Sequence, residues 1–230
     1  ATENTWVNYL MGVAQEIEKR GHQLQGMNVV LEGNVPLSSG LSSSAALEVA
    51  TAFTFDKLNS LDIDPVEMAV LTQAAENNFV GVNCGIMDQY ISRLGKKGYA
   101  LMIDCRSTEY ELVPFTSKDY MIVICNSNVE RDLVDSEYNK RREECNKAAD
   151  FFSKKLDHKV KALRDVTIEE FNEYANELQE ITKKRARHII SENKRVLESM
   201  GALENNDLKT FGRLMVESHE SLRDDYEVSC

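Results

Sequence analysis

The stretch Val35–Ala46 combines a proline, a glycine and five serines in a pattern suited to binding phosphate. Residues 27–31 predict a strand before it, and the apolar spacing of Leu47–Phe53 predicts a helix after it. Backbone N–H groups at a helix start lack intrahelical partners, and the helix dipole attracts an anion there. A serine that merely caps an ordinary helix is the simpler alternative, but Pro36 and Gly40 favour a nucleotide site.

No Gly-Lys-Ser or Gly-Lys-Thr follows the serines, so this is not a Walker-type loop and no loop lysine can balance the phosphate charge. Magnesium would then carry more of that role, and it needs an oxygen ligand near the loop hydroxyls. Glu76, at the end of a mostly apolar helical run, is one candidate ligand. A solvated glutamate at a helix end is the alternative interpretation.

Asp88 lies in the segment Cys84–Gln89, where it follows a glycine and stands among apolar residues. Because burying an unpaired charge is costly, this carboxylate is either a helix cap or a placed general base. Trp6 and Tyr9, close together on the first predicted helix, could stack on a purine, although core packing also explains them.

Several elements must position these residues. Apolar residues spaced four, three and four apart from Trp6 to Ile17 predict a helix over residues 5–20. Asp64 followed by Pro65 predicts the start of another helix. Strands are predicted at three apolar segments, namely residues 99–104, 110–115 and 120–125.

The later part of the chain is rich in charged helices. Thr167 and Glu170 form a capping box before a helix, and two amphipathic helices are predicted at residues 183–203 and 207–222. The basic run Lys183–Arg187 could bind phosphate, but a solvated helix face explains it better. The change in composition predicts two domains, 1–117 and 118–230.

The net charge of −11 argues against nucleic acid or an anionic membrane as a partner. No apolar run is long enough for a membrane span, and no secretory signal is present. The five cysteines are scattered and odd in number, which predicts reduced thiols in the cytoplasm, and the spacing of the four histidines does not favour zinc.

Taken together, these segments resemble galactokinases, which belong to the superfamily of galactokinase, homoserine, mevalonate and phosphomevalonate kinases (GHMP kinases). The most specific similarity lies in four segments, residues 84–89, 101–107, 126–139 and 218–228. The resemblance implies an α+β GHMP-kinase fold. It comprises a mixed sheet with helices in a ribosomal-protein-S5-like N-terminal domain and a helix-rich α+β C-terminal domain, both truncated.

The resemblance also implies an activity, the transfer of the γ-phosphate of ATP to the anomeric hydroxyl of α-D-galactose, with ATP and Mg²⁺ required. Asp88 then matches the base, and Ser44 and Glu76 match the Mg²⁺ ligands. The residues that match the phosphate loop are Ser38, Ser39, Gly40, Leu41, Ser42, Ser43 and Ser44. Contacts of the sugar are matched by Gly85, Asp88 and Tyr138. The helix beside the adenine is matched by Trp6 and Tyr9.

Two parts of the galactokinase pattern have no match here. One is the arginine and the Gly-Glu-His-Thr-Asp segment that grip phosphate and sugar, and the other is a second glycine-rich segment nearer the C-terminus. The chain, which begins without methionine, thus resembles the middle of a galactokinase and is expected to be cut at both ends. We therefore expect these 230 residues alone to have little or no kinase activity.

Three alternatives remain open from the sequence. An N-acetylgalactosamine kinase shares the same motifs. A galactokinase-like sensor would bind galactose and ATP and act through a protein partner, although the uninterrupted Ser42–Ala46 favours an enzyme. Finally, the isolated chain could aggregate, because a sheet without its neighbouring strands exposes unpaired edges.

Overall fold

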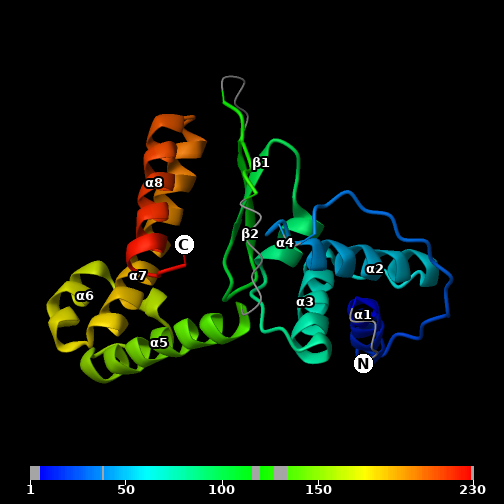
Figure 1. Ribbon diagram of the computed structural model, residues 1–230, viewed down its shortest axis with the longest axis horizontal. Coiled ribbons are helices and arrows are strands. Elements are labelled where there is room, and N and C mark those ends of the chain that lie inside the picture. The colour runs from blue at the N-terminus through cyan, green and yellow to red at the C-terminus, as the bar shows by residue number, and fades with distance from the viewer. Residues whose placement is uncertain (1–5, 38, 116–119, 127–133, 229–230) are drawn as a thin grey trace. The chain divides into compact units, whose positions relative to one another are not determined.

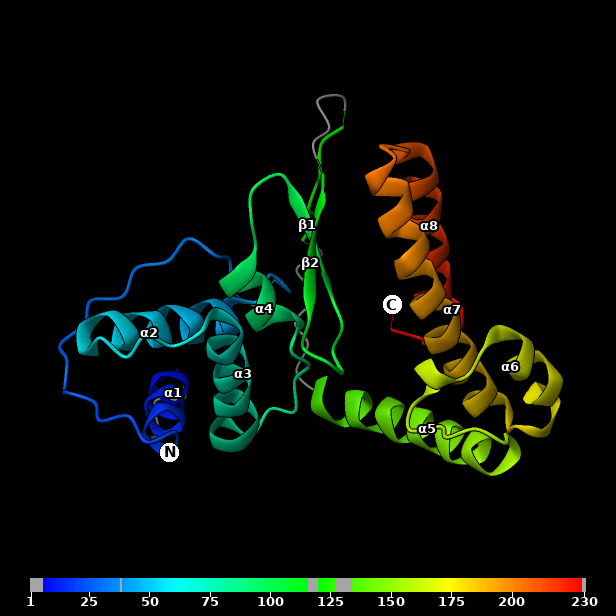
Figure 2. The same ribbon diagram turned by 180° about the vertical axis from the view of Figure 1, so that it is seen from behind.

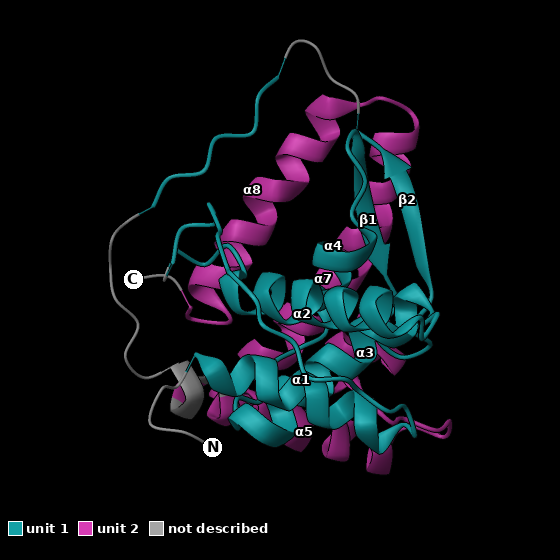
Figure 3. Ribbon diagram, turned by 90° about the vertical axis from the view of Figure 1, so that its right-hand side faces the viewer, with its two compact units in different colours: residues 1–132 teal, residues 133–230 magenta. Residues whose placement is uncertain are grey.

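The computed structural model describes residues 6–37, 39–115, 120–126 and 134–228. The chain divides into two compact units, residues 1–132 and residues 133–230, which are coloured separately in Figure 3. Each unit is described by itself. The domain boundary expected after residue 117 from composition stays a prediction.

In the described part of unit 1 there are four α-helices and one π-helical turn, besides a strand pair. Their bounds are α1 Val7–Lys19, α2 Ser43–Asn59, α3 Pro65–Ala75, the π turn Glu76–Val80 and α4 Met87–Leu94 (Figure 1). The core joins α1, α2 and α3 through Val13, Ile17, Ala52, Phe55, Ile63, Met68, Leu71 and Ala75. The predicted α1 face is confirmed at Val13 and Ile17, which are fully buried, whereas Trp6 is 53% exposed.

Two local features fix the helices of unit 1. Asp64 caps α3, because its Oδ1 accepts from the amides of Val66 at 2.8 Å and Glu67 at 3.2 Å, as the Asp-Pro pair predicted. Helix α1 also packs against the π turn at Gly12, where an added Cβ would lie 3.0 Å from the Cβ of Phe79. Only a glycine allows this close approach without displacing the turn.

Two of the predicted strands form one antiparallel pair. Strand β1 (Tyr99–Ile103) pairs with β2 (Tyr110–Pro114), from Tyr99 opposite Pro114 to Ile103 opposite Tyr110. Asp104 closes the connecting turn by accepting from the amides of Arg106 and Ser107. The expected α+β class is confirmed, and its sheet, within the described residues, has these two antiparallel strands.

The strand predictions at residues 27–31 and 120–125 are wrong for this structure, because neither segment is in a strand. Both have the apolar composition of buried strands, but a strand needs a partner to bond its backbone. Their side chains lie open instead, with Val30 97% and Met121 87% exposed. The sequence pattern therefore identified segments that favour a strand, but it could not show whether another strand is there to pair with them.

Unit 2 is helical in its described part. Its elements are α5 Val134–Lys155, the 3₁₀ turns Leu163–Asp165 and Ala175–Glu177, α6 Ile168–Tyr174, α7 Glu180–Glu204 and α8 Leu208–Asp224. Helices α7 and α8 run side by side (Figure 2). The predicted capping box is confirmed, since the Thr167 hydroxyl accepts from the Glu170 amide and the Glu170 carboxylate accepts from the Thr167 amide. A core centred on Phe152 and Phe171 joins α5, α6 and α7.

The basic run Lys183–Arg187 is only in part the solvated helix face that the sequence favoured, because Arg185 is buried whereas the Arg187 side chain is 43% exposed. Arg185 is only 4% exposed, and its Nε donates to Glu144 Oε2 at 2.8 Å. The same guanidinium also donates to Glu227 Oε2 at 2.9 Å and to the carbonyl of Asp225. Carboxylates far away in the sequence thus hold this side chain inside unit 2.

None of the described helices is long and apolar enough to cross a membrane.

Candidate functional site

The serine loop reaches α2 in an unusual backbone conformation. Gly40 has φ +73° and Ser42, the residue before the helix, has φ +57°. A left-handed serine is strained, and such strain is concentrated at functional sites. Ser42 also makes no side-chain cap bond, so the simple capping alternative does not explain it. Ser39 donates to the Pro36 carbonyl at 2.7 Å, and Ser38 lies outside the described residues.

Helix α2 turns two different faces to its surroundings. Ser44 and Glu48 are four residues apart, so their side chains lie on one side of the helix, one turn from each other. Glu48 is fully buried there, next to the core face of Ala45 and Ala52. Ser44 therefore points along the same side as Glu48, toward the elements that Glu48 contacts.

Those contacts form a buried polar group that we call the carboxamide cluster, consisting of Glu48, Glu76 and Gln89. Gln89 Nε2 donates to Glu76 Oε2 at 2.7 Å and to Glu48 Oε2 at 3.1 Å. Gln89 and Glu48 are 0% exposed and Glu76 is 5% exposed. Glu76 is thus not the solvated helix-end glutamate of the alternative interpretation.

The segment 81–86 is tied to the same cluster through Cys84. Its thiol donates to Glu76 Oε2 at 3.3 Å, and its amide donates to Asn77 Oδ1 at 2.9 Å. Burial, together with the nearby Glu76 carboxylate, raises the pKa of the Cys84 thiol to about 12. Cys84 therefore stays protonated and serves as a second donor to Glu76.

Glu48 differs electrostatically from an ordinary glutamate. Burial, and then the charge of Glu76, raises the pKa of Glu48 to about 9, against the opposing hydrogen bond from Gln89. Glu48 is accordingly a neutral acid near pH 7, which relieves repulsion in the cluster. The Oε1 atoms of Glu48 and Gln89 are buried without a hydrogen-bond partner.

The other expected site residues occupy defined places. Asp88 is half-buried in the first turn of α4, beside Gln89 in the chain, and Gly85 is exposed just before that helix. Trp6 precedes α1 and Tyr9 lies in its first turn. Tyr138 belongs to α5 in unit 2, and its side chain lies outside the described part of the structure.

The residues on this side of α2 suit a hard cation only in combination with a ligand. Within the described ranges, no three His, Cys, Asp or Glu side chains are grouped to hold a metal. Mg²⁺ usually binds through one or two protein oxygens plus substrate phosphates. The Ser44 hydroxyl and the Glu76 carboxylate fit that requirement chemically, with the phosphates completing the ligand set.

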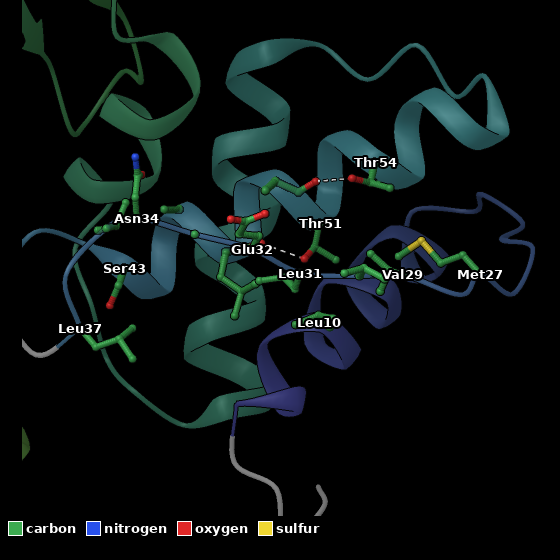
Figure 4. A pocket seen from close by; sticks show the side chains of 16 residues that line it. Leu10, Met27, Val29, Leu31, Glu32, Asn34, Leu37, Ser43, Thr51 and Thr54 are labelled. Carbon is green, nitrogen blue, oxygen red and sulfur yellow. Dashed lines mark hydrogen bonds between the residues drawn. The ribbon is translucent and has the colours of Figure 1, made fainter.

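A pocket of about 580 Å³ lies on the other side of α2, between that helix, α1 and the extended segment 27–37 (Figure 4). Apolar side chains such as Leu10 and Leu31 dominate its lining, and Ser43 lines it at the serine loop. Thr51 also lines the pocket, but its hydroxyl donates to the Leu47 carbonyl at 2.7 Å within the same helix. Trp6 and Tyr9 do not line this pocket, so it does not test their expected place beside the adenine.

Sequence reasoning missed Glu48 and Gln89. The signals were present, because Glu48 is an acid in an otherwise small and apolar helical stretch and Gln89 directly follows Asp88. Neither residue has an obvious chemical role by itself. Their importance follows from the bonds between them.

Two comparisons with known proteins show which proteins this chain resembles. Residues 8–96 match the model of the GHMP kinases N terminal domain. The crystal structure of Lactococcus lactis galactokinase complexed with galactose is 36% identical to this chain and superposes with a TM-score of 0.94. That match covers 100% of this chain and 60% of the Lactococcus protein. The expected resemblance is confirmed, because residues 8–96 match the N-terminal domain of the GHMP kinases and the whole chain superposes on a galactokinase.

Proposed function

We propose that the protein is a galactokinase, which transfers the γ-phosphate of ATP to the anomeric hydroxyl of α-D-galactose. The proposal is supported by the family match and by the similarity to a galactokinase whose structure contains galactose. It concerns the complete protein, because this chain spans about three fifths of that relative.

In this proposal each group of candidate residues has one task. The amides and hydroxyls from Ser38 to Ser44 bind the triphosphate, and Ser44 and Glu76 hold Mg²⁺. When bound, Mg²⁺ neutralises charge on the phosphates. Asp88 accepts the proton of the sugar hydroxyl as that oxygen attacks. Sugar contacts are assigned to Gly85 and Tyr138, and contacts of the adenine to Trp6 and Tyr9.

The observation that carries the proposal is the pair of hydrogen bonds from Gln89. They connect the second turn of α2, the π turn and the first turn of α4. The expected phosphate loop leads into α2, the expected metal ligand Glu76 is in the π turn, and Asp88 is in α4. These bonds therefore join the elements that carry the proposed roles.

The test is an ATP-turnover assay of the complete protein with galactose. Asp88→Asn should lower kcat by about 10²- to 10⁴-fold, because general-base help is lost. Asp62→Asn is the matched control, since Asp62 is exposed and has φ +56°, which asparagine tolerates. Equal activity of Asp88→Asn and the wild type would contradict the proposed role of Asp88.

The same assay distinguishes the alternatives. Faster turnover of N-acetylgalactosamine than of galactose would indicate the other sugar kinase. Binding of galactose and ATP without phosphorylation would indicate a sensor. Residues 1–230 assayed alone should show little activity, and galactose-dependent rates equal to those of the complete protein would refute that expectation.

A further inference from the structure

Gln89 is a fully buried polar side chain whose orientation is fixed by charge. Its Nε2 lies between two carboxyl groups, at 2.7 Å from Glu76 Oε2 and 3.1 Å from Glu48 Oε2. Turning the amide over would place its oxygen, an acceptor, against the Glu76 carboxylate. The observed orientation instead leaves Gln89 Oε1 buried without a partner. The side chain therefore donates two hydrogen bonds to the acids, while its own oxygen accepts none.

An amide that only filled space would be a poor choice at this position. A methionine or leucine of similar size would fill the same volume without an unpartnered oxygen. The amide is explained if the two carboxyl groups must be held in place. Of these two, Glu76 is the acid that the proposed function assigns to Mg²⁺.

We infer that Gln89 is a positioning residue, which orients the Glu76 carboxylate toward the metal–nucleotide complex and ties it to the helix of Asp88. This inference rests on the proposed function. Residues that hydrogen-bond to metal ligands fix the ligand's direction, and their loss typically weakens metal binding about 10- to 100-fold. Glu48 serves as the second anchor of the amide, on the helix that follows the serine loop.

The position of Gln89 in the chain adds a second effect. Asp88 is its neighbour in the first turn of α4, so the bonds from Gln89 also fix where that turn begins. Loss of the amide should therefore disturb the metal ligand directly and the base indirectly. The metal effect should be the larger one, because Gln89 bonds directly to Glu76 and is linked to Asp88 only through the backbone of α4.

The primary experiment measures Mn²⁺ binding to the complete protein with a non-hydrolysable ATP analogue, using the electron paramagnetic resonance signal of free Mn²⁺. Gln89→Met should weaken Mn²⁺ binding about 10- to 100-fold. In turnover assays, its apparent KM for Mg²⁺ should rise by a similar factor.

Gln73→Met is the matched control. Gln73 donates its amide to the Cys84 carbonyl at 3.2 Å, near the same loop, but it bonds to neither carboxyl group. Its Mn²⁺ affinity should stay within about threefold of the wild type, well below the loss expected for a metal-ligand partner.

A double variant separates positioning from stability. Gln89→Met alone leaves Glu48 buried without its donor, so this variant should lose stability as well as affinity. In Glu48→Leu/Gln89→Met that unpaired acid is gone, and the urea midpoint should recover toward the wild-type value. Mn²⁺ affinity should remain weak, because Glu76 is still without its amide donor.

The outcomes are distinct. Wild-type Mn²⁺ affinity in either Gln89 variant, or recovery of affinity together with stability in the double variant, would overturn the role of Gln89 and leave the proposed function intact. Absence of Mn²⁺–nucleotide binding in the wild-type protein would overturn the proposed function, and this inference with it.

Discussion

The buried group around Arg185 in unit 2 and the carboxamide cluster in unit 1 satisfy their polar atoms differently. In unit 2, Arg185 is surrounded by acceptors, and its Nε and both terminal nitrogens all donate. In unit 1, two acids share one amide nitrogen, and two oxygens stay unpartnered. A fully satisfied network fixes a unique fold, whereas an incomplete one is a weakness unless it serves a function. The difference indicates a structural cluster in unit 2 and a functional one in unit 1.

The strongest test of this contrast removes Arg185. Arg185→Leu should lower the free energy of unfolding by about 3–5 kcal/mol, because Glu144 would remain buried without its partner. Urea unfolding followed by circular dichroism measures the change. Arg187→Leu is the control, since the Arg187 side chain is 43% exposed and its pair with Asp225 should contribute at most about 1 kcal/mol. Equal losses in both variants would contradict the structural role of Arg185.

A second test uses pH. Burial lowers the pKa of His188 to about 4, Asp225 opposes that shift, and Arg195 and Arg185 add to it. Between pH 6.5 and 4 the unfolded chain then binds the proton that folded His188 does not, so stability falls as pH falls. The loss should be about 3 kcal/mol. His188→Phe, which preserves an aromatic ring against Tyr226, should lack this component when urea midpoints at pH 7 and pH 4.5 are compared.

The smallest expected effects are at helix caps, where the units should behave alike. Asp64 caps α3 in unit 1, and Asp207 Oδ1 accepts from the Thr210 amide at 3.0 Å to cap α8 in unit 2. Replacing either with alanine should lower the free energy of unfolding by about 1 kcal/mol. Asparagine at the same positions should cost less, because it retains the acceptor. A cap effect confined to one unit would show that the units differ in more than their buried charges.

Local chemistry was predictable from the sequence, and distant partners were not. The caps at Asp64 and Thr167 depend on residues two or three positions away, so their spacing identified them. Gln89 and Arg185 each bond to a glutamate 41 residues earlier in the chain. No periodicity reveals such a pair, which is why Arg185 was expected in solvent and Gln89 was overlooked.

Strands show the same limit. Residues 99–103 and 110–114 are close in the chain and find each other across a short turn. Residues 27–31 have an equally good strand pattern and pair with nothing in the described sheet. Of the candidate site, the local sequence offered the loop serines, Glu76 and Asp88, and the family resemblance singled out Ser44 and assigned the roles. Their assignment as ligands and base stays a prediction.

Gly12 limits which amino acids can replace it during evolution. A glycine in mid-helix normally lowers helix stability by roughly 1 kcal/mol relative to alanine, so selection for stability should readily replace it. Here an added methyl group would meet the Phe79 Cβ at 3.0 Å, on the π turn that begins with Glu76, and the Ala75 carbonyl at 3.2 Å, at the end of α3. A substitution of Gly12 by alanine would favour the helix but displace that turn. Position 12 should therefore tolerate substitution poorly, although it is distant in the sequence from the residues assigned to the sugar.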